Sequence, residues 1–297
     1  MPTRPPRPAR MLRRTVLLSV AGVVIGAGTL GVEAEATTRH ADARRARGRQ
    51  AATLVGGPMA PPPVVPPVTP PAGPPAPPPV VSTHAPHWAH RWHTPIYELD
   101  DFLRRDRQAH FPHRSIMLTV DDGPHPVWTP RYLRLFAKHH VTATFNLIGE
   151  QVHPNRKIVR ALVAEGHTVA NHTWTHDERL PFRSRRDIHR EIARTNEAIH
   201  DVTGLRPTQF RAPGGVWGAK VFAELARERM MPVDWNIDPR DWARPGIPAI
   251  ESAIRATRPG DIILCHDGGG DRSQTYRALK KVIPELKHRG LRFVTLP

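Results

Sequence analysis

Cysteine and aromatic residues are scarce in this chain of 297 residues. Cys265 is the single cysteine, so an intramolecular disulfide is excluded. Its apolar neighbours predict a buried thiol that packs as a small hydrophobic side chain. Lysine is absent from residues 1–95, which carry eleven arginines and three acidic residues. Residues 96–297 carry 32 basic and 24 acidic residues, the mixed composition of a globular domain that can bury a full core.

The N-terminus has the pattern of an export signal. A basic stretch, RPPRPARMLRR, precedes an uncharged run of 18 residues from Thr15 to Val32. The small residues Ala34 and Ala36 fit a cleavage site of the A-x-A type. We therefore expect a signal peptide over 1–36, and the length of the run leaves an uncleaved signal anchor as the alternative. Either outcome places the rest of the chain outside the cytoplasmic membrane, secreted or attached to the cell envelope.

A proline-rich stretch separates this signal from the remainder of the chain. Residues 58–79 read PMAPPPVVPPVTPPAGPPAPPP, a composition that forms an extended spacer and cannot build a core. We predict a disordered Arg/Pro-rich linker over 37–95 and one globular domain over 96–297. The net charge of +16 favours an acidic envelope or membrane surface over nucleic acid. Half of this charge lies in the tail, and no nucleic-acid motif accompanies it.

From Ser115 onward, predicted strands and helices alternate. Apolar runs such as SIMLTV (115–120) predict strands, and amphipathic stretches such as TPRYLRLFAKHH (129–140) predict helices. About seven such alternations follow one another, and the later predicted strands include QFRAP, MPVDWNI and LRFVTL. This alternation is typical of parallel strands joined by crossover helices, in a βα barrel or a doubly wound sheet.

Chemically reactive side chains stand where the predicted strands end. They are Asp121 and Asp122, His172 and His176, Arg211, Asp238 and Asp241, and His266. In a parallel βα barrel the carboxyl ends of the strands form one face, where the site is built. Five loops that are far apart in the sequence are therefore expected to converge on one mouth.

Two of these groups suggest a metal and a base. In NHTWTH, His172 and His176 are four residues apart, which brings two imidazoles together, although one such pair among 18 histidines is weak evidence alone. In DDG, Asp121 and Asp122 repel each other unless a cation is close. If one aspartate binds a divalent cation with the histidines, the other can stay ionised and accept a proton. The simpler alternative is an acidic turn after a strand.

Residues 113–297 resemble the polysaccharide deacetylase family, also known as the NodB homology domain or carbohydrate esterase family four. The resemblance rests on motifs in the family's order, TVDDGPHP, NHTWTH, RAPGG, DPRDW and LCH. It implies a distorted (β/α) barrel that removes N- or O-acetyl groups from polysaccharides with a divalent metal, often zinc. The side chains that the family uses for catalysis and metal binding are all present, which argues against a homologue without activity.

The first three motifs imply a base and a metal site. The first aspartate of the family's T-x-D-D-G-P motif is its catalytic base, here Asp121, and the second is a metal ligand, here Asp122. The histidine motif implies His172 and His176 as the other ligands. The arginine of the third motif, Arg211, is expected to orient the base through a charged hydrogen bond.

The remaining motifs imply a general acid and a pocket for the acetyl group. His266 is expected to be the acid and Asp241 to keep it protonated, while Trp242 and Leu264 line the pocket. Gly214 stands where the family often has an aromatic residue whose backbone N–H contacts the oxyanion. Glycine retains that N–H and removes one wall of the substrate groove.

The expected function is therefore that of an exported, metal-dependent deacetylase. It would hydrolyse N-acetyl groups of a cell-envelope polysaccharide, first of all the N-acetylglucosamine residues of peptidoglycan. The alternatives are a chitooligosaccharide or acetylxylan deacetylase on the same fold, or a non-catalytic module that binds the wall. We expect zinc as the metal, a polysaccharide as partner, no nucleic acid, a monomer, and a membrane anchor if the signal stays uncleaved.

Overall fold

A computed structural model describes residues 93–297. The predicted signal segment 1–36, and the predicted linker as far as residue 92, lie outside the described residues. No helix in the described region is both long and apolar enough to span a membrane. The domain boundary at residue 96 stays a prediction.

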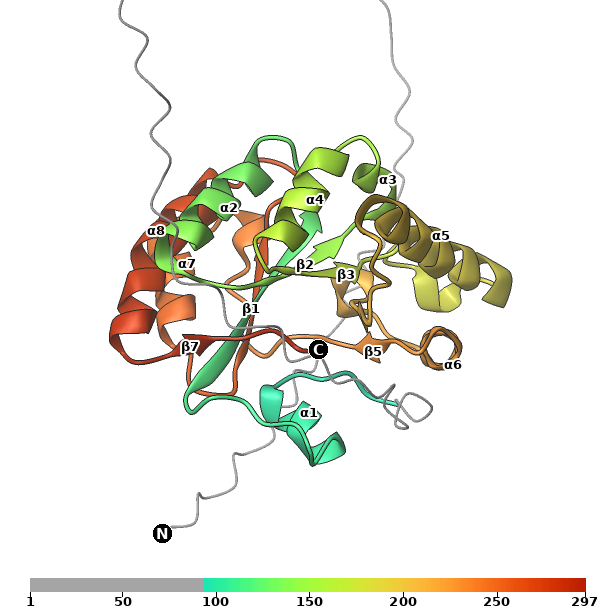
Figure 1. Cartoon of the computed structure of the whole chain (residues 1–297), viewed down its shortest axis with the longest axis horizontal. Helices are drawn as coiled ribbons and strands as arrows, with labels where there is room; N and C mark the ends of the chain where they lie inside the picture. Colours follow the sequence, from blue (N-terminus) through green and yellow to red (C-terminus); the bar gives the residue numbers. More distant parts are fainter. Residues whose placement is uncertain (1–92) are drawn as a thin grey trace, which may run out of the picture. The chain divides into compact units, whose positions relative to one another are not determined.

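Seven parallel strands form the sheet at the centre of the described region (Figure 1). They pair in the order β5-β4-β3-β2-β1-β6, and β7 pairs with the beginning of β1. Every pairing in this sheet is parallel, which confirms the predicted fold class of a distorted barrel of about seven parallel strands. The strands are β1 Ser115–Gly123, β2 Thr144–Leu147, β3 Thr168–Asn171, β4 Gln209–Phe210, β5 Met231–Pro232, β6 Ile262–His266 and β7 Arg292–Phe293.

Helices lie against the outer face of the curved sheet (Figure 1). The helix predicted over 129–140 is α2, which runs from Trp128 to His139, and the ends of the longer helix α5 carry local signals. Ser184 accepts a hydrogen bond from the backbone of Asp187 at the start of α5, and Gly204 ends that helix in the left-handed region. The helices are α1 Leu99–Arg105, α2 Trp128–His139, α3 Gly149–Val152, α4 Arg156–Ala164, α5 Arg185–Thr203, α6 Ala219–Glu228, α7 Ile247–Arg255 and α8 Ser273–His288, with 3₁₀ turns η1 Leu180–Phe182, η2 Pro213–Gly215 and η3 Asp241–Ala243.

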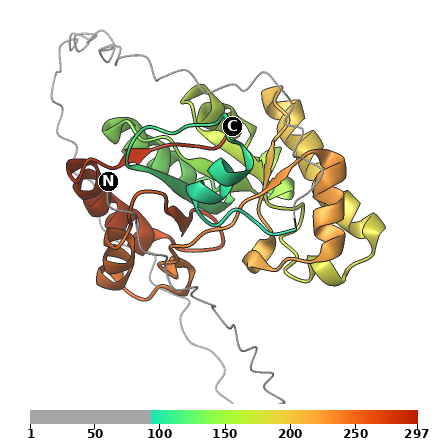
Figure 2. The same ribbon diagram turned by 90° about the horizontal axis from the view of Figure 1, so that it is seen from below.

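Helix α1 covers the end of the sheet where β1 begins, as Figures 1 and 2 both show. Leu99 and Phe102 of α1 are buried in a small apolar cluster with Met117 of β1 and Ile262 of β6. The backbone N–H of Leu99 also donates to the carbonyl of Gly260 at 2.8 Å. This end is therefore closed by packing, and the opposite end, at the carboxyl ends of the strands, carries the reactive residues.

The two faces of the central strands differ in chemistry because side chains alternate along a strand. On β1, Val120 points outward into the main core beneath the helices, as does the next-but-one residue Leu118. Thr119 and Asp121 occupy the other face and are equally buried. The thiol of Cys265 lies in the main core, as predicted, and burial raises its pKa above the usual range.

The segment MPVDWNI, predicted as one strand over 231–237, is divided between the two edges of the sheet. Only Met231–Pro232 pairs with β4, and Val233 then bridges to Ile96. Ile237 bridges instead to Ile263 of β6, with its N–H donating to the carbonyl of Ile262 at 3.1 Å. The prediction of a continuous strand was wrong because this segment spans the gap between β5 and β6, and it thereby closes the barrel. The predicted strands QFRAP and LRFVTL are likewise shortened to two residues each.

Candidate active site

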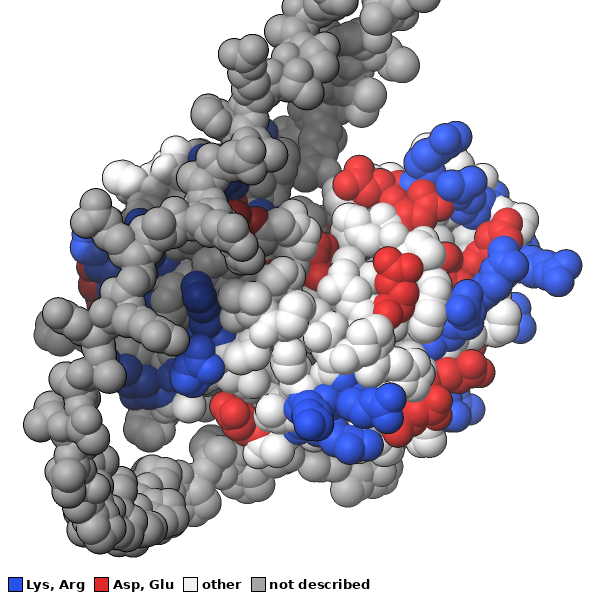
Figure 3. Space-filling view, turned by 90° about the horizontal axis from the view of Figure 1, so that it is seen from above, with Lys and Arg blue, Asp and Glu red and all other residues white. Residues whose placement is uncertain are grey.

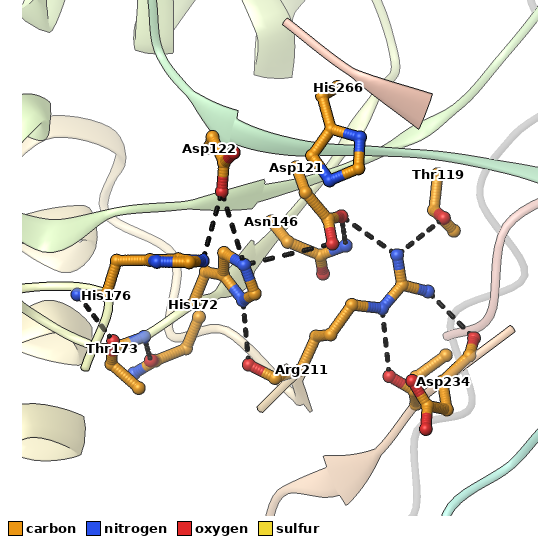
Figure 4. Close-up of polar contacts among 12 residues, drawn as sticks. Thr119, Asp121, Asp122, Asn146, His172, Thr173, His176, Arg211, Asp234 and His266 are labelled. Carbon is orange, nitrogen blue, oxygen red and sulfur yellow. Dashed lines mark hydrogen bonds and ion pairs between the residues drawn. The ribbon is translucent and has the colours of Figure 1, made fainter. Parts of the chain in front are cut away.

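Three predicted metal ligands meet at the carboxyl ends of β1 and β3 (Figure 4). The Oδ1 atom of Asp122 lies 3.6 Å from Nε2 of His172 and 3.3 Å from Nε2 of His176. One donor atom from each residue lies within 4.8 Å of the other two. Two imidazoles and one carboxylate form a common ligand set for zinc at catalytic sites, where a further coordination position stays open.

The chemistry of these three residues fits a cation. Asp122 Oδ1 is buried and has no hydrogen-bond partner among the described residues, which is costly for a carboxylate oxygen. Burial raises the pKa of Asp122, but His172 and the neighbouring imidazoles outweigh it and hold the pKa well below the usual range. Burial, followed by the neighbouring His172, lowers the pKa of His176, which favours the neutral imidazole that binds metals.

His172 is oriented for the cluster by the backbone. Its Nδ1 lies 2.8 Å from the carbonyl oxygen of Arg211, so that Nδ1 carries the proton and Nε2 is left to face Asp122. Burial lowers the pKa of His172, whereas Asp121 and then Asp122 raise it, and the net shift is upward. Without a cation, His172 thus offsets part of the negative charge of the two carboxylates, alongside Arg211, which pairs with Asp121 at 2.8 Å.

The loop that carries both histidines is held in an unusual conformation. Thr173 and His176 have φ angles of 67° and 59°, in the left-handed region that residues other than glycine rarely adopt. The backbone N–H of Thr173 donates to Asn171 Oδ1 at 2.8 Å, and that of His176 donates to Thr173 Oγ1 at 3.0 Å. Glu191 of α5 accepts from two further N–H groups of the loop. Backbone strain that the surroundings support in this way is typical of functional sites.

Asp121 lies beside the cluster and is anchored through one oxygen. Its Oδ1 accepts a hydrogen bond from Arg211 Nη1 at 2.8 Å and another from Asn146 Nδ2 at 2.6 Å. Its Oδ2 lies 3.8 Å from His172 Nε2 and faces the cluster. Asp121 and Asp122 therefore have different surroundings, one held by an arginine and an amide, the other facing two imidazoles.

Arg211 is fully buried, and all three nitrogens of its guanidinium donate hydrogen bonds (Figure 4). It donates to the hydroxyl of Thr119 at 2.6 Å and to the carbonyls of Val233 and Asp234 at 3.1 and 2.8 Å, besides the bond to Asp121. A buried charge needs such pairing to be tolerated. The structure thus places Arg211 where it fixes the Asp121 carboxylate, as the family motif implies.

His266 and Asp241 form a second pair at the same mouth. His266 Nδ1 lies 2.7 Å from Asp241 Oδ1, and the backbone N–H of His266 donates to Asp241 Oδ2 at 2.9 Å. Thr275 donates to the same oxygen at 2.9 Å. Burial lowers the pKa of His266, but the Asp241 carboxylate, with smaller contributions from Asp122 and Asp121, raises it to about 9.

Together with the expected role of His266 as the general acid, this pKa predicts the alkaline limit of activity. Because the pKa of His266 is raised above its ordinary value of 6.5, the proton is retained through neutral pH and lost as the pH rises through about 9. We expect kcat to fall over that interval. Asp241→Asn removes the main cause of the upward shift, so its kcat should fall at a lower pH than that of the unaltered protein. The pH profile of kcat for both proteins measures this, and an alkaline limb that does not move would contradict the assignment.

The predicted substrate residues occupy different positions around the site. Leu264 is buried on β6 opposite Thr119, on the inner face. Trp242 in η3 is 50% exposed, with the Arg240 guanidinium 5.3 Å from its ring. Gly214 has a φ of 60°, and a Cβ atom there would lie 3.2 Å from the Glu178 carboxyl carbon. Glu178 therefore fills space next to the position where the family often has an aromatic residue.

Several residues that support the site were not predicted from the sequence. Asn146, which bonds Asp121, could have been suspected because it is a polar residue inside the apolar strand TFNL. Asn171 and Glu191 support the histidine loop, and Glu191 lies on α5, outside the motif that carries the two histidines. Only the tertiary contact reveals its role.

Asp267 is a further buried carboxylate that the motifs did not identify. It accepts a short hydrogen bond from the hydroxyl of Thr129, and its Oδ1 has no partner among the described residues. Burial raises its pKa most, the Thr129 bond opposes this, and the neighbouring Asp122 and Asp121 add to the rise, so that it reaches about 7. Its position directly after His266, the last residue of β6, was the signal that could have identified it.

A metal-ligand cluster, an arginine-held carboxylate and a histidine–aspartate pair at the mouth of a βα barrel define a metal-dependent hydrolase. The chain belongs to the polysaccharide deacetylase family. A profile of the family described as Polysaccharide deacetylase matches residues 108–232.

Three relatives illustrate this membership. A chitooligosaccharide deacetylase of Sinorhizobium fredii is 41% identical over 209 residues, which are 66% of this chain and 97% of the relative. A peptidoglycan-N-acetylglucosamine deacetylase of Bacillus cereus is 40% identical over 193 residues, 62% of this chain and 86% of the relative. A family 4 carbohydrate esterase from Streptomyces lividans, solved in complex with acetate, has a TM-score of 0.59 and 30% identity, with 62% of this chain and 94% of that chain covered.

Proposed function

We propose that this protein removes N-acetyl groups from N-acetylglucosamine residues of a cell-envelope polysaccharide, peptidoglycan in the first place, and releases acetate. One observation carries the proposal. Asp121 and His266 are direct partners in the parallel pairing of β1 with β6, so their side chains face the same space beside the metal-ligand cluster. A base and an acid on opposite sides of one reacting carbon are what hydrolysis of an amide requires.

The residues divide the chemistry between them. Asp122, His172 and His176 would hold the metal, which supplies Lewis-acid polarisation of the acetyl carbonyl and of water when bound. Asp121, fixed by Arg211, accepts the proton of the attacking water through the oxygen that faces the cluster.

Breakdown of the tetrahedral intermediate to products then depends on the leaving group. His266, kept protonated by Asp241, donates its proton to the departing amine, because an amide anion is too basic to leave. The backbone N–H of Gly214 is the proposed contact for the oxyanion. Trp242 and Leu264 would line the acetyl pocket.

The surface around the mouth suits a neutral sugar polymer. In Figure 3, the visible centre of the face toward which β1 runs carries few charges, chiefly acidic ones, and the basic side chains gather toward its edge. Zinc is our proposed metal because two imidazoles and a carboxylate are its usual ligands. We further propose that the chain is exported, acts as a monomer outside the cytoplasmic membrane, and reaches the wall through residues 37–95. Chitooligosaccharides and acetylxylan remain the alternative substrates, and a non-catalytic wall-binding module the alternative function.

Acetate release tests the function directly. The full chain is incubated with peptidoglycan, with N-acetylated chitooligosaccharides and with acetylxylan, with and without chelator. We expect acetate from the peptidoglycan and chitooligosaccharide reactions, abolished by the chelator and restored by added zinc. Release from acetylxylan alone would select the ester substrate, and no chelator-sensitive acetate from any of the three would refute the deacetylase function.

Loss of a metal ligand can be measured without turnover. Replacing an outer-shell partner of a ligand already costs about 10- to 100-fold in metal affinity, so Asp122→Asn should lower zinc affinity by about 100-fold or more. Glu178→Gln is the matched control, since that exposed carboxylate lies near His176 but outside the ligand set. Competition with a zinc-sensitive dye reports both affinities. Equal affinity in the two variants would remove Asp122 from the site.

A further inference from the structure

A basic groove runs between α2 and α8 on the outer side of the barrel, away from the mouth. The two helices lie side by side in Figure 1. Tyr276 of α8 packs against Tyr132 of α2, with 6.1 Å between the centres of the two rings. The groove encloses about 460 Å³. Its lining includes Arg134, Lys138 and His139 of α2 and Tyr276, Lys280 and Pro284 of α8.

The sequence of the two helices makes this groove positive. Helix α2 contains no acidic residue, and α8 contains only Glu285. Glu285 is engaged by Arg255 of α7 at 2.6 Å, and Lys281 is engaged by Glu251 of α7 at 3.1 Å. The ion pairs of α8 therefore point toward α7, and α8 brings no acidic side chain to the groove.

Three of the cations that line the groove have no acidic partner among the described residues. Arg134, Lys138 and Lys280 are exposed and make no ion pair among the described residues. The Lys280 ammonium lies 6.0 Å from the centre of the Tyr276 ring, at the limit of a cation–π contact. Burial first, and then Lys138, Lys287 and His140, lower the pKa of His139, so Lys138 is one of the positive charges near this imidazole. An anion placed in the groove would be attracted by the three cations that line it.

We propose that the α2–α8 groove binds a linear phosphodiester polymer. Arginine forks and lysine ammonium groups are the side chains that bind phosphate oxygens. Because the cations stand on two facing walls, they can contact successive phosphates of one strand, whereas a membrane presents a plane that does not enter a groove. The groove lies on the outside of the sheet whose inner face carries Asp121 and His266. The bound polymer therefore leaves the mouth open, and it would hold the enzyme in the envelope layer where its polysaccharide substrate lies.

Lysine labelling can locate the polymer on the full chain. The six lysines all lie within the described region, and residues 1–95 contain none, so the Arg-rich segment adds no labelled lysine of its own. A glycerol phosphate oligomer is the probe, and acetylation of each lysine is followed by mass spectrometry. We expect labelling of Lys138 and Lys280 to fall about fivefold at saturation, with Lys157 and Lys220 unchanged, and protection to fade with added salt. Uniform protection of all lysines, or none, would overturn the proposal.

Charge reversal supplies a second, independent measurement. The double variant Lys138→Glu/Lys280→Glu should weaken oligomer binding by about tenfold or more, because each lost phosphate contact also removes a counterion-release contribution. The matched control is Lys157→Glu/Arg186→Glu, which changes the net charge equally at exposed positions on α4 and α5. Both proteins are checked for unaltered thermal unfolding. Equal weakening in the two variants would show that binding is non-specific and would contradict the proposal.

Two further anionic ligands, tested in the same labelling experiment, show whether the groove prefers a phosphodiester chain to a membrane surface or to a carboxylate chain. Vesicles of phosphatidylglycerol and phosphatidylcholine present phosphodiesters on a plane, and polyglutamate presents carboxylates on a chain. Protection of Lys138 and Lys280 by the oligomer, and not by either of these, supports a phosphodiester polymer. Protection by vesicles alone would replace it with a membrane surface, and equal protection by polyglutamate would overturn the choice of phosphate.

Discussion

Asp121→Asn is expected to lower kcat on an N-acetylated substrate by about 10³-fold while the metal stays bound. The amide has the size of the carboxylate and can still accept a hydrogen bond from Arg211, so the geometry around Oδ1 is preserved. It cannot accept the proton of the attacking water. A loss of this size corresponds to about 4 kcal/mol of transition-state stabilisation.

Both kcat and the bound metal content are measured for Asp121→Asn and for a control variant. Asp201→Asn is the control, because Asp201 is an exposed aspartate near the C-terminal end of α5 and the substitution changes the same atoms. Its kcat should stay within about twofold, as is usual for surface substitutions away from a site. Asp121→Asn with full metal and near-normal kcat would show that another group is the base. The same variant without metal would show that Asp121 belongs to the ligand set.

His266→Gln is expected to separate substrates by their leaving groups. On an N-acetylated sugar, kcat/KM should fall by about 10³-fold, because the amine leaves only after protonation. On an acetate ester of a nitrophenol the fall should stay below about tenfold, since that anion leaves without a proton. The Asp241 carboxylate, 2.7 Å from His266 Nδ1, keeps this imidazole charged and so keeps it competent as the acid.

The two substrates are compared on the same preparation of each variant. His110→Gln serves as the control, since His110 is exposed and precedes the sheet. An equal loss on amide and ester would mean that His266 stabilises the oxyanion or the fold instead of protonating the amine. A loss on the ester alone would contradict the role more directly.

Much of the fold was predictable because its signals are local. Amphipathic periods, helix-ending glycines and apolar strand runs gave the main helices and the central strands to within a few residues. The division of residues 231–237 between two sheet edges could not be predicted, because a bridge is defined by a partner distant in the sequence. The same holds for α1, whose apolar residues need β1 and β6 to be buried.

The candidate site divides in the same way. Short motifs at predicted strand ends were enough to identify the candidate catalytic and metal-binding residues. These are Asp121, Asp122, His172, His176, Arg211, Asp241 and His266. Their partners Asn146 and Glu191 were not, because nothing in a short window shows which carboxylate or amide a side chain will reach. The unequal surroundings of the two adjacent aspartates likewise appear only after folding.

The sequence by itself determined the residue types, the alternation of strands and helices, and the placing of reactive side chains at strand ends. These are consequences of local propensity and side-chain periodicity, which act over a few residues. The tertiary structure alone decided which oxygen of Asp121 is held by Arg211, which nitrogen of His172 faces the cluster, and that α7 neutralises one side of α8 and leaves the other positive. Those choices depend on distances between segments far apart in the chain, and electrostatic and hydrogen-bond energies change steeply with distance.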